Sequence, residues 1–346
     1  MGRRFAALLC ASGLLCALLT GCHSHQGQPD PVQTTIFAMN TVMNLTVYGE
    51  QDALDQAVAA IYEMERQFSA TDENSSIYAL NHAGGEWVDM DPLAANLVAS
   101  GKSWGSLTDG ALDITAYPAV QAWGFPSGEY RVPDQDELAR LADSIDYTQI
   151  EFNLERFRCR IPAGMEVDLG AVAKGVAGDQ LWAILSAAGV KSALLDLGQS
   201  SIQAIGSKPD GTPWRIGIQD PDGTGYLGVL EISNQAVGTS GNYQRFFEED
   251  GVRYCHIIDP NTAAPVQNGL ASVTVVSSTG DRADALSTAL FVMGQEDAAD
   301  FWRTHTEPNF DVIFIAEDGS ISITPGLKDA FTLAEEYKNR EVTVLE

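Results

Sequence analysis

The chain of 346 residues lacks the short motifs that mark the commonest enzyme classes. It has no GxxxxGKS/T phosphate loop, no GxGxxG turn leading from a strand into a helix, no GxSxG nucleophile elbow and no HExxH zinc helix. These absences argue against the most frequent nucleotide-binding, hydrolase and zinc-enzyme readings. No period of about 20 to 50 residues recurs, which argues against solenoid and propeller folds.

Basic residues are scarce, because 20 lysines and arginines stand against 47 acidic residues, for a formal net charge of -27. Nucleic acid and anionic lipid headgroups are therefore poor partners for this chain. A phosphate-bearing substrate would need local help from a metal ion or from helix N-termini.

Cysteine is also rare, with five in the chain. Cys10 and Cys16 lie in an apolar leader and Cys22 follows it, so only Cys159 and Cys255 belong to the expected folded part. Two isolated cysteines do not make a disulfide framework. We expect each of them to be a small buried apolar residue.

Long apolar runs are absent apart from residues 5–19, FAALLCASGLLCALL, which follow Arg3 and Arg4. This run is shorter than the about 20 residues of a membrane span and has the pattern of a secretory signal. Its end, LTGC, resembles a bacterial lipobox, which implies a lipoprotein signal peptide over residues 1–21 and lipid on Cys22. The protein would then be anchored to the cell membrane on its extracytoplasmic side. The alternative is a plain secretory signal with a chance cysteine.

The remaining sequence divides into a short linker and one folded unit. Residues 22–33 carry two prolines and no periodicity, which predicts a flexible tether. Residues 34–346 contain no linker-like break and should form one domain. Their strands and helices are interspersed, and hairpin turns outnumber crossovers, so we predict an α+β fold with largely antiparallel sheets and packed helices. Expected elements are a strand pair over residues 34–49, a hairpin over 150–161, and helices near 54–68, 92–106, 171–188, 281–294 and 296–304.

Two stretches carry an aspartate in an unusual setting. In VDLGAVAKG, Asp168 is expected to end a strand and Lys174 to lie in the first turn of a helix, an arrangement that suits an anion. The alternative is a capped helix with Lys174 as a solvated surface charge. In TDGALDITAYP, Asp113 lies in an apolar run and needs either hydrogen-bond donors or a metal ion as a partner.

Two further stretches carry groups suited to catalysis. In CHIIDPNTAAP, His256 is expected on a strand, where its imidazole could be a general base or only a hydrogen-bonded structural residue. In DRADALSTALFVMG, Asp284 and Thr288 are one helical turn apart with Ser287 beside them. Their oxygens suit Mg²⁺, although a capping aspartate and a threonine bonded to its own helix would give the same spacing.

Taken together, these stretches follow an order that resembles the ApbE family, the bacterial FAD:protein FMN transferases, which are often lipoproteins. The resemblance spans about Phe37 to Gly294. It is carried by AMNT, FSATDENSSIYALN, TDGALDIT with PAVQAWGF, VDLGAVAKG, KPDGTPWRIGIQDP, VGTSGNYQRFF, HIIDPNT and ADALSTALFVMG.

The resemblance implies a T-fold-like architecture and a magnesium-dependent transfer of FMN from FAD to a threonine or serine hydroxyl of an acceptor flavoprotein, with release of AMP. It implies Asp284, Thr288 and the main-chain carbonyl of Ala171 as Mg²⁺ ligands, and His256 as the base for the acceptor hydroxyl. It places the FAD contacts at Met39, Ala111, Leu112, Asp113, Asp168, Lys174 and Ile258.

Family acceptors include subunits of Na⁺-translocating NADH:quinone reductase and of Rnf-type complexes, and extracellular flavoproteins. The competing interpretations are an FAD pyrophosphatase that yields FMN and AMP, and a lipoprotein that binds FAD without chemistry. Three residues depart from the family pattern, because Asn40, Gln199 and Ala263 each stand where the family usually has glycine. Each adds a Cβ where the backbone can require a positive φ.

Overall fold

A nine-stranded sheet forms the centre of the structure, a computed structural model that describes residues 30–223, 225–305 and 309–346. The strand order is β1-β2-β6-β7-β10-β15-β16-β17-β19, and β17 and β19 form the one parallel pair in this sheet as described. The strands are β1 (Val32–Ala38), β2 (Thr41–Val47), β6 (Ala193–Asp196), β7 (Ser201–Ile205), β10 (Ala236–Gly241), β15 (Leu270–Ser277), β16 (Phe310–Ala316), β17 (Ile321–Ile323) and β19 (Val342–Val344). The predicted signal peptide and Cys22 lie outside the described residues.

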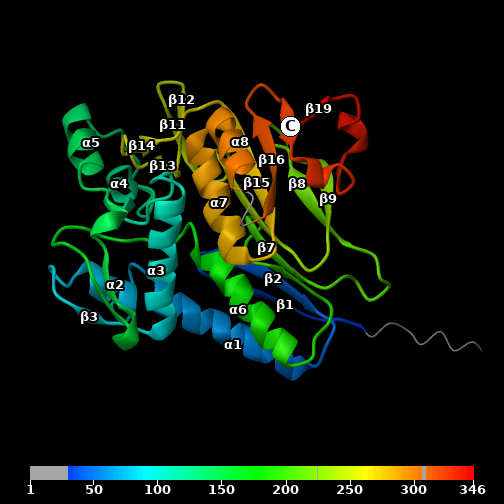
Figure 1. The fold of residues 1–346 in the computed structure, drawn as a ribbon, viewed down its shortest axis with the longest axis horizontal. Coiled ribbons are helices and arrows are strands. Elements are labelled where there is room, and N and C mark those ends of the chain that lie inside the picture. The colour runs from blue at the N-terminus through cyan, green and yellow to red at the C-terminus, as the bar shows by residue number, and fades with distance from the viewer. Residues whose placement is uncertain (1–29, 224, 306–308) are drawn as a thin grey trace, which may run out of the picture.

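Four helices cover one face of this sheet (Figure 1). They are α1 (Gln51–Phe68), α6 (Ala173–Ala187), α7 (Gly280–Met293) and α8 (Gln295–Thr304). Apolar residues three and four apart make one side of α1 buried, including Leu54, Ile61 and Phe68, and this side packs against β2, β6 and α6. The helices predicted near residues 54–68, 171–188, 281–294 and 296–304 are therefore present, each beginning within three residues of its expected start. Among the described residues, no helix is long and apolar enough to cross a membrane.

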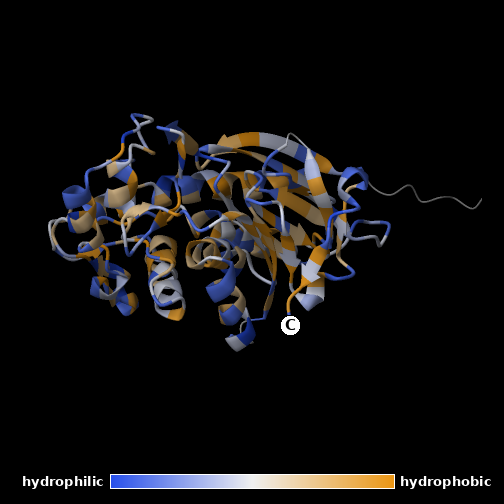
Figure 2. Ribbon diagram, turned by 90° about the horizontal axis from the view of Figure 1, so that it is seen from above, coloured by the Kyte–Doolittle hydropathy of each residue, from blue (hydrophilic) through white to orange (hydrophobic). Residues whose placement is uncertain are grey.

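A smaller sheet packs on the opposite face of the central sheet. It contains β8 (Trp214–Gln219), β9 (Tyr226–Ile232) and β18 (Phe331–Leu333) in the order β18-β9-β8. Ile216 and Leu230 from this sheet share an apolar cluster with Ile313 and Ile315 of β16, while the alternate residues of β16 face the helices. Figure 2 shows the apolar strands lying between the outer layers.

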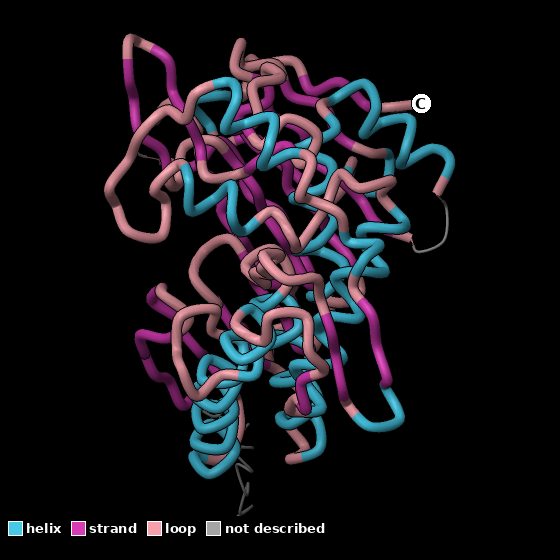
Figure 3. The backbone as a smooth tube through the Cα atoms, turned by 90° about the vertical axis from the view of Figure 1, so that its left-hand side faces the viewer, coloured by secondary structure: helices cyan, strands magenta, loops and turns pink. Residues whose placement is uncertain are grey.

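A third group of elements lies on the left of Figure 1 and faces the viewer in Figure 3. Its helices are α2 (Ser76–Asn81), α3 (Pro92–Leu107), α4 (Tyr117–Ala122) and α5 (Gln135–Ala142), with a three-stranded sheet of β3 (Val88–Asp89), β4 (Glu151–Asn153) and β5 (Arg158–Arg160). Two hairpins pair β11 (Phe246–Glu249) with β12 (Val252–Cys255) and β13 (Ile258–Asp259) with β14 (Ala264–Pro265). Short 3₁₀ turns occur at Tyr147–Gln149, Leu154–Arg156, Pro325–Leu327 and Glu335–Tyr337.

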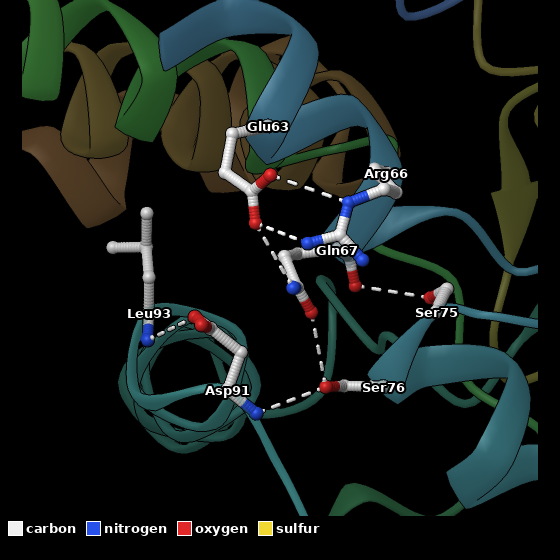
Figure 4. A network of polar contacts seen from close by, with 7 residues as sticks. All are labelled: Glu63, Arg66, Gln67, Ser75, Ser76, Asp91 and Leu93. Carbon is white, nitrogen blue, oxygen red and sulfur yellow. Dashed lines mark hydrogen bonds and ion pairs between the residues drawn. The ribbon is translucent and has the colours of Figure 1, made fainter.

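Polar contacts join this group to α1 (Figure 4). Ser75 is the N-cap of α2, and its hydroxyl also donates to the main-chain oxygen of Gln67 on α1 at 3.0 Å. Ser76 donates to the Gln67 side chain at 3.2 Å and accepts from the main-chain nitrogen of Asp91, the N-cap of α3, at 2.9 Å. The stretch FSATDENSSIYALN therefore sets the positions of three helix ends through its serines.

Both cysteines of the folded part are free and buried, as predicted. Cys159 lies in β5, and burial raises the pKa of its thiol to about 12. Cys255 ends β12, and burial likewise raises its thiol pKa. Neither thiol is an accessible thiolate at neutral pH.

Candidate functional site

A pocket of about 1150 Å³ opens where the central sheet, the N-terminal ends of α6 and α7, and the segment between α3 and α4 meet. Every site residue predicted within the described chain lines this one pocket. These residues are Met39, Ala111, Leu112, Asp113, Asp168, Ala171, Lys174, His256, Ile258, Asp284 and Thr288. Side chains separated by up to about 250 positions in the sequence thus share one cavity.

The turn between β1 and β2 forms one rim of the pocket. Ala38 pairs with Thr41, so the turn consists of Met39 and Asn40, which have φ values of 48° and 58°. Two positive φ values in a two-residue hairpin define a type I′ turn, which asparagine tolerates well. The main-chain nitrogen of Met39 donates to the carboxylate of Glu65 on α1 at 2.8 Å, which holds the turn against that helix.

Asp168 lies in a turn that leads into α6. The prediction that it ends a strand is wrong, because residues 163–172 form turns and irregular chain. Hydrogen bonds from other segments hold this part of the chain. The main-chain nitrogen of Asp168 donates to Ile114 at 2.9 Å, and Asn81 holds the preceding residue, Val167, through both its main-chain groups. The Asp168 carboxylate accepts from Gly170 at 2.8 Å, and burial raises its pKa.

Lys174 lies in the first turn of α6, as predicted. The interpretation of Lys174 as a solvated surface charge is wrong, because its ammonium group points into the pocket and donates to the Ser200 hydroxyl. Burial lowers its pKa, while the nearby Asp284 carboxylate opposes that shift. Lys174 is therefore a partly desolvated cation within the pocket wall.

The carboxylate of Asp284 is buried in the pocket wall, with 6% of the residue exposed. It does not cap its own helix. One oxygen accepts from the main-chain nitrogen of Gly175, at the start of α6, at 2.7 Å, and the other accepts from the Ser201 hydroxyl at 2.7 Å. Burial raises the pKa of Asp284 to about 6, although Lys174 and these two donors oppose the shift. An ionised carboxylate in this place favours an additional cation.

Hydroxyl groups continue from Asp284 along the pocket wall. Ser240 of β10 lies 3.0 Å from the Ser287 hydroxyl and 3.1 Å from the Thr288 hydroxyl. Ser287 also donates to the main-chain oxygen of Asp284 at 2.9 Å, so it is Ser287 that bonds back to its own helix. Thr288 also lines the pocket, with its hydroxyl next to that of Ser240.

Glycines bring the start of α7 unusually close to its neighbours. A Cβ on Gly280 would lie 2.2 Å from the main-chain oxygen of Gly175, and a Cβ on Gly238 of β10 would lie 2.3 Å from that of Ala283. Asp179 of α6 caps α7 by accepting from Gly280 at 2.7 Å and from the following residue at 2.9 Å. These backbone contacts place Asp284 within reach of Gly175.

The donor set at this place fits Mg²⁺. The part of the chain that the structure describes contains no cluster of three or more His, Cys, Asp or Glu side chains that could hold a metal ion. The candidate ligands are instead the Asp284 carboxylate, the Thr288 hydroxyl and the Ala171 carbonyl, from three residues that line the pocket. These are hard oxygen donors, and Mg²⁺ commonly takes few protein ligands and keeps water and phosphate oxygens in its remaining positions.

The Asp113 carboxylate is not isolated, because protein groups donate hydrogen bonds to it. One carboxylate oxygen accepts from the main chain and hydroxyl of Thr115 at 2.8 and 2.7 Å, and the other accepts from the main chain of Tyr147 at 2.9 Å. Burial raises the pKa of Asp113, and these bonds oppose the shift. Its carboxylate therefore fixes the loop that carries Ala111 and Leu112 into the pocket.

His256 follows the last residue of β12 rather than lying within the strand, which corrects the predicted position by one residue. Its main-chain nitrogen donates to the carbonyl of Arg245 at 3.0 Å, and its Nδ1 lies 3.3 Å from the same oxygen. A carbonyl only accepts, so Nδ1 carries the proton in the neutral ring and Nε2 keeps its lone pair. Burial lowers the pKa of His256 to about 4, with a smaller contribution from the Arg245 charge.

Arg245 is a pocket residue that motif reasoning did not single out. Lys174 and Arg245 are the two cations that line the pocket. The hydrogen bond given for the Arg245 guanidinium is a long one of 3.4 Å to the main-chain oxygen of Asn40, whereas seven other arginines pair with carboxylates. The sequence feature that could have indicated Arg245 is a basic residue, rare in this chain, within the stretch SGNYQRFF.

The three departures from the family pattern occupy left-handed backbone. Asn40, Gln199 and Ala263 have φ values of 58°, 68° and 54°. These positions therefore require the conformation that glycine adopts most easily, as the sequence comparison predicted. Ala263 is buried, and its main-chain oxygen accepts from the Trp123 indole at 2.8 Å, so the turn is held by tertiary contacts.

Comparison with known proteins agrees with this fold. The model of the ApbE family matches residues 39–314, and the chain belongs to this family. An FAD:protein FMN transferase of Treponema pallidum is 32% identical over 314 residues, covering 84% of this chain and 86% of the relative. Another from Vibrio cholerae is 33% identical over 290 residues, covering 81% of this chain and 85% of the relative.

Solved structures share the whole architecture. The ApbE protein of Thermotoga maritima superposes with a TM-score of 0.79 at 30% identity, over 90% of this chain and 100% of the other. The flavinyl transferase ApbE of Pseudomonas stutzeri, in its apo form, gives 0.75 at 27% identity, over 88% and 99%. The predicted α+β, single-domain, T-fold-like architecture is confirmed.

Proposed function

We propose that this protein is an FAD:protein FMN transferase that uses Mg²⁺ to move FMN from FAD to a threonine or serine hydroxyl, with release of AMP. The transferase activity itself rests on membership of the ApbE family and on relatives with that name over most of the chain. One observation carries the finer chemistry, namely that a single pocket is lined by the oxygen donors Asp284 and Thr288 and by the base His256.

Mg²⁺ would be held by the Asp284 carboxylate, the Thr288 hydroxyl and the carbonyl of Ala171. When bound, it would neutralise charge on the pyrophosphate oxygens and stabilise charge on the departing AMP. Gly175 and Ser201 would keep the Asp284 carboxylate oriented, because each of its oxygens accepts one of their hydrogen bonds.

FAD would lie along the rest of the pocket wall. The proposed contacts are Met39, Ala111, Leu112, Asp113, Asp168, Lys174 and Ile258. Lys174 and Arg245 would attract the phosphates, since a chain with a net charge of -27 otherwise repels them. Arg245 is the better candidate for direct phosphate contact because it is exposed to the pocket, whereas Lys174 is engaged by Ser200.

His256 would accept the proton of the acceptor hydroxyl at Nε2. The acceptor oxygen then forms a bond to the FMN phosphorus, and the bond between that phosphorus and the oxygen of AMP breaks. The lowered pKa keeps the imidazole neutral at physiological pH, so a lone pair is available without prior deprotonation. General base catalysis of this kind contributes roughly 10²–10⁴-fold to the rate.

The remaining assignments concern location and partners. We propose that residues 1–21 are a lipoprotein signal peptide and that lipid on Cys22 holds the catalytic domain at the outer surface of the cell membrane. The tether predicted over residues 22–33 must end before Val32, because β1 begins there. An acceptor would then be an extracytoplasmic flavoprotein or a membrane-complex subunit with an exposed threonine or serine. The LTGC sequence at the end of the apolar leader supports this arrangement.

The test is to incubate purified protein with FAD, Mg²⁺ and the soluble flavin-carrying domain of an Rnf-type or Na⁺-translocating NADH:quinone reductase subunit. We expect a fluorescent covalent adduct on a denaturing gel, one AMP for each adduct, and loss of both with a chelator. FMN and AMP without an adduct would indicate an FAD pyrophosphatase instead. FAD retained intact, with no AMP, would indicate a non-catalytic FAD-binding lipoprotein.

A further inference from the structure

Strand β1 is a free edge of the central sheet. Within residues 30–223, 225–305 and 309–346, its one strand partner is β2, and the opposite edge of the sheet is β19 (Figure 1). The register pairs Ala38 with Thr41 across the two-residue turn. In such a hairpin the pair flanking the turn is hydrogen-bonded and every second pair is not. The main-chain groups of Gln33, Thr35 and Phe37 therefore point away from β2, toward the open edge.

The seven residues of β1 lack the charges, prolines and bulges that protect many edge strands. Natural edge strands carry charges, prolines or bulges, or are very short, because their unpaired amides would otherwise pair with other chains. β1 has seven residues, VQTTIFA, without any charged residue, proline or register shift. Valine, threonine, isoleucine and phenylalanine all favour extended backbone. An uncharged edge is notable in a chain where 47 residues are acidic.

The edge leads directly to the pocket. Phe37 is 64% exposed and Val42, its cross-strand partner, is 51% exposed, and both line the pocket mouth. Beyond them, the oxygen of Asn40 contacts the Arg245 guanidinium at 3.4 Å, and the Arg245 carbonyl contacts His256. The end of β1 is therefore connected to the proposed base, His256, through Asn40 and Arg245.

We propose that the free edge of β1 is the docking site for the acceptor protein, which adds an extended segment as a further strand of the sheet. This inference rests on the proposed transferase function. Main-chain hydrogen bonds to Gln33, Thr35 and Phe37 hold the segment, and an apolar side chain covers Phe37 and Val42. The hydroxyl to be modified follows at the end of the paired segment, where it enters the pocket beside His256.

The occupant is an acceptor polypeptide because the edge is continuous with the pocket that the acceptor hydroxyl must enter. Recognition through main-chain groups also fits a catalyst that reads a short extended segment rather than a whole folded surface. A second copy of this chain on the same edge would instead cover Phe37 and Val42 and obstruct the pocket mouth.

The substitution Thr35→Pro tests whether the main-chain N–H of residue 35 binds the acceptor. Proline removes the outward main-chain donor and puts its ring at the open edge, while the bonds from β1 to β2 remain. Thr35→Ala is the matched control, because both variants lose the hydroxyl bond to Asn44, 2.8 Å long, and alanine keeps the amide. We expect Thr35→Pro to raise the KM for the acceptor domain by about tenfold or more. Thr35→Ala should stay within about twofold of the parent protein.

Two further measurements make the outcome decisive. FAD binding, followed by quenching of flavin fluorescence, should be unchanged in both variants, which shows that the pocket is intact. Amide exchange at residues 33–37 of the parent protein should slow when the acceptor domain is added, and this readout needs no variant to fold. Equal KM values in both variants, or unchanged exchange in the complex, would overturn the proposal. A parent protein that is dimeric by light scattering and becomes monomeric with Thr35→Pro would assign the edge to self-association and also overturn it.

These results separate the docking proposal from the proposed function. If the parent protein modifies the acceptor and Thr35→Pro does so with the same KM, only the docking proposal fails. If the parent protein forms no adduct under any condition, the proposed function fails before the edge is tested.

Discussion

At the residue scale, Asp284 is a buried carboxylate in the wall of the pocket. Both of its oxygens accept hydrogen bonds from protein donors, and burial still raises its pKa to about 6. Hydrogen bonds to the ionised carboxylate lower its pKa and burial raises it, and at Asp284 burial is the larger effect. Lys174 already opposes this shift, and a further cation beside Asp284 would stabilise its ionised form more.

His256 gives a prediction for stability against pH. Its pKa is about 4 in the folded protein, because of burial and Arg245, against 6.5 for an ordinary histidine. Between these values the unfolded chain holds more protons, so the free energy of unfolding falls as the pH drops. From pH 7.5 to pH 5 the loss from this group should be about 2 kcal/mol. Urea unfolding of the parent protein and of His256→Gln at both pH values measures it, and an unchanged difference between the two proteins would contradict the assignment.

Arg245 gives a prediction for substrate binding. Arg245→Gln keeps the main-chain carbonyl that orients His256 but removes the guanidinium, so FAD binding should weaken about tenfold or more. Riboflavin, which has no phosphate, should bind the parent and the variant equally. Titration of flavin fluorescence with both ligands distinguishes the two. Equal losses for FAD and riboflavin would mean that the substitution damages the pocket rather than a phosphate contact.

At the element scale, the helices were predictable and the contacts that align them were not. Local signals in the sequence, namely apolar spacing, a first-turn proline and a terminating glycine, predicted α1, α3, α6 and α7. The same spacing placed Asp284 and Thr288 on one side of α7. It could not show that Asp284 accepts from Gly175, which is 109 positions away, because that bond depends on how α6 and α7 pack. The order of β7, β10 and β15 could not be predicted either, because it depends on pairing between strands that are distant in the sequence.

Gly238 gives a prediction about how closely β10 packs against α7. A Cβ there would meet main-chain atoms of α7 at 2.3 to 2.7 Å, and backbone cannot move aside as a flexible side chain can. Gly238→Ala should therefore displace α7, lower the free energy of unfolding by about 1–3 kcal/mol and weaken Mg²⁺ binding. Gly225→Ala is the control, because its Cβ would meet a side-chain oxygen at an ordinary 3.7 Å. Urea unfolding and magnesium titration check both; a variant as stable as the control would contradict the close packing.

At the scale of the whole molecule, the fold converts dispersed motifs into one pocket. Family resemblance predicted which residues belong together, and all of those in the described chain line the same cavity. Sequence reasoning could not foresee that Lys174 is desolvated, since burial of a first-turn lysine depends on the neighbouring strands. It also could not foresee Arg245 or the irregular chain before α6, because both are set by tertiary contacts with distant segments.

The negative net charge of the whole chain explains why phosphate binding in the pocket requires local cations. The chain carries a net charge of -27, yet its pocket must accept a dinucleotide with two phosphates if the proposed function holds. Lys174, Arg245 and a bound Mg²⁺ would together create a positive region inside an acidic surface. The same surface charge disfavours nucleic acid, so the positive region would serve a small anionic ligand within a cavity of about 1150 Å³.

The substitution Asp284→Asn tests the central claim most directly. Asparagine can accept from Gly175 through its oxygen and donate to Ser201 through its nitrogen, so the fold should persist while the charge is lost. The measurement is the intact mass of an acceptor domain after incubation with FAD and Mg²⁺, with circular dichroism confirming that the variant is folded. We predict that the parent protein adds the mass of one FMN and that Asp284→Asn adds none at ordinary Mg²⁺ concentrations. A folded Asp284→Asn protein that transfers FMN at the parent rate would contradict the account.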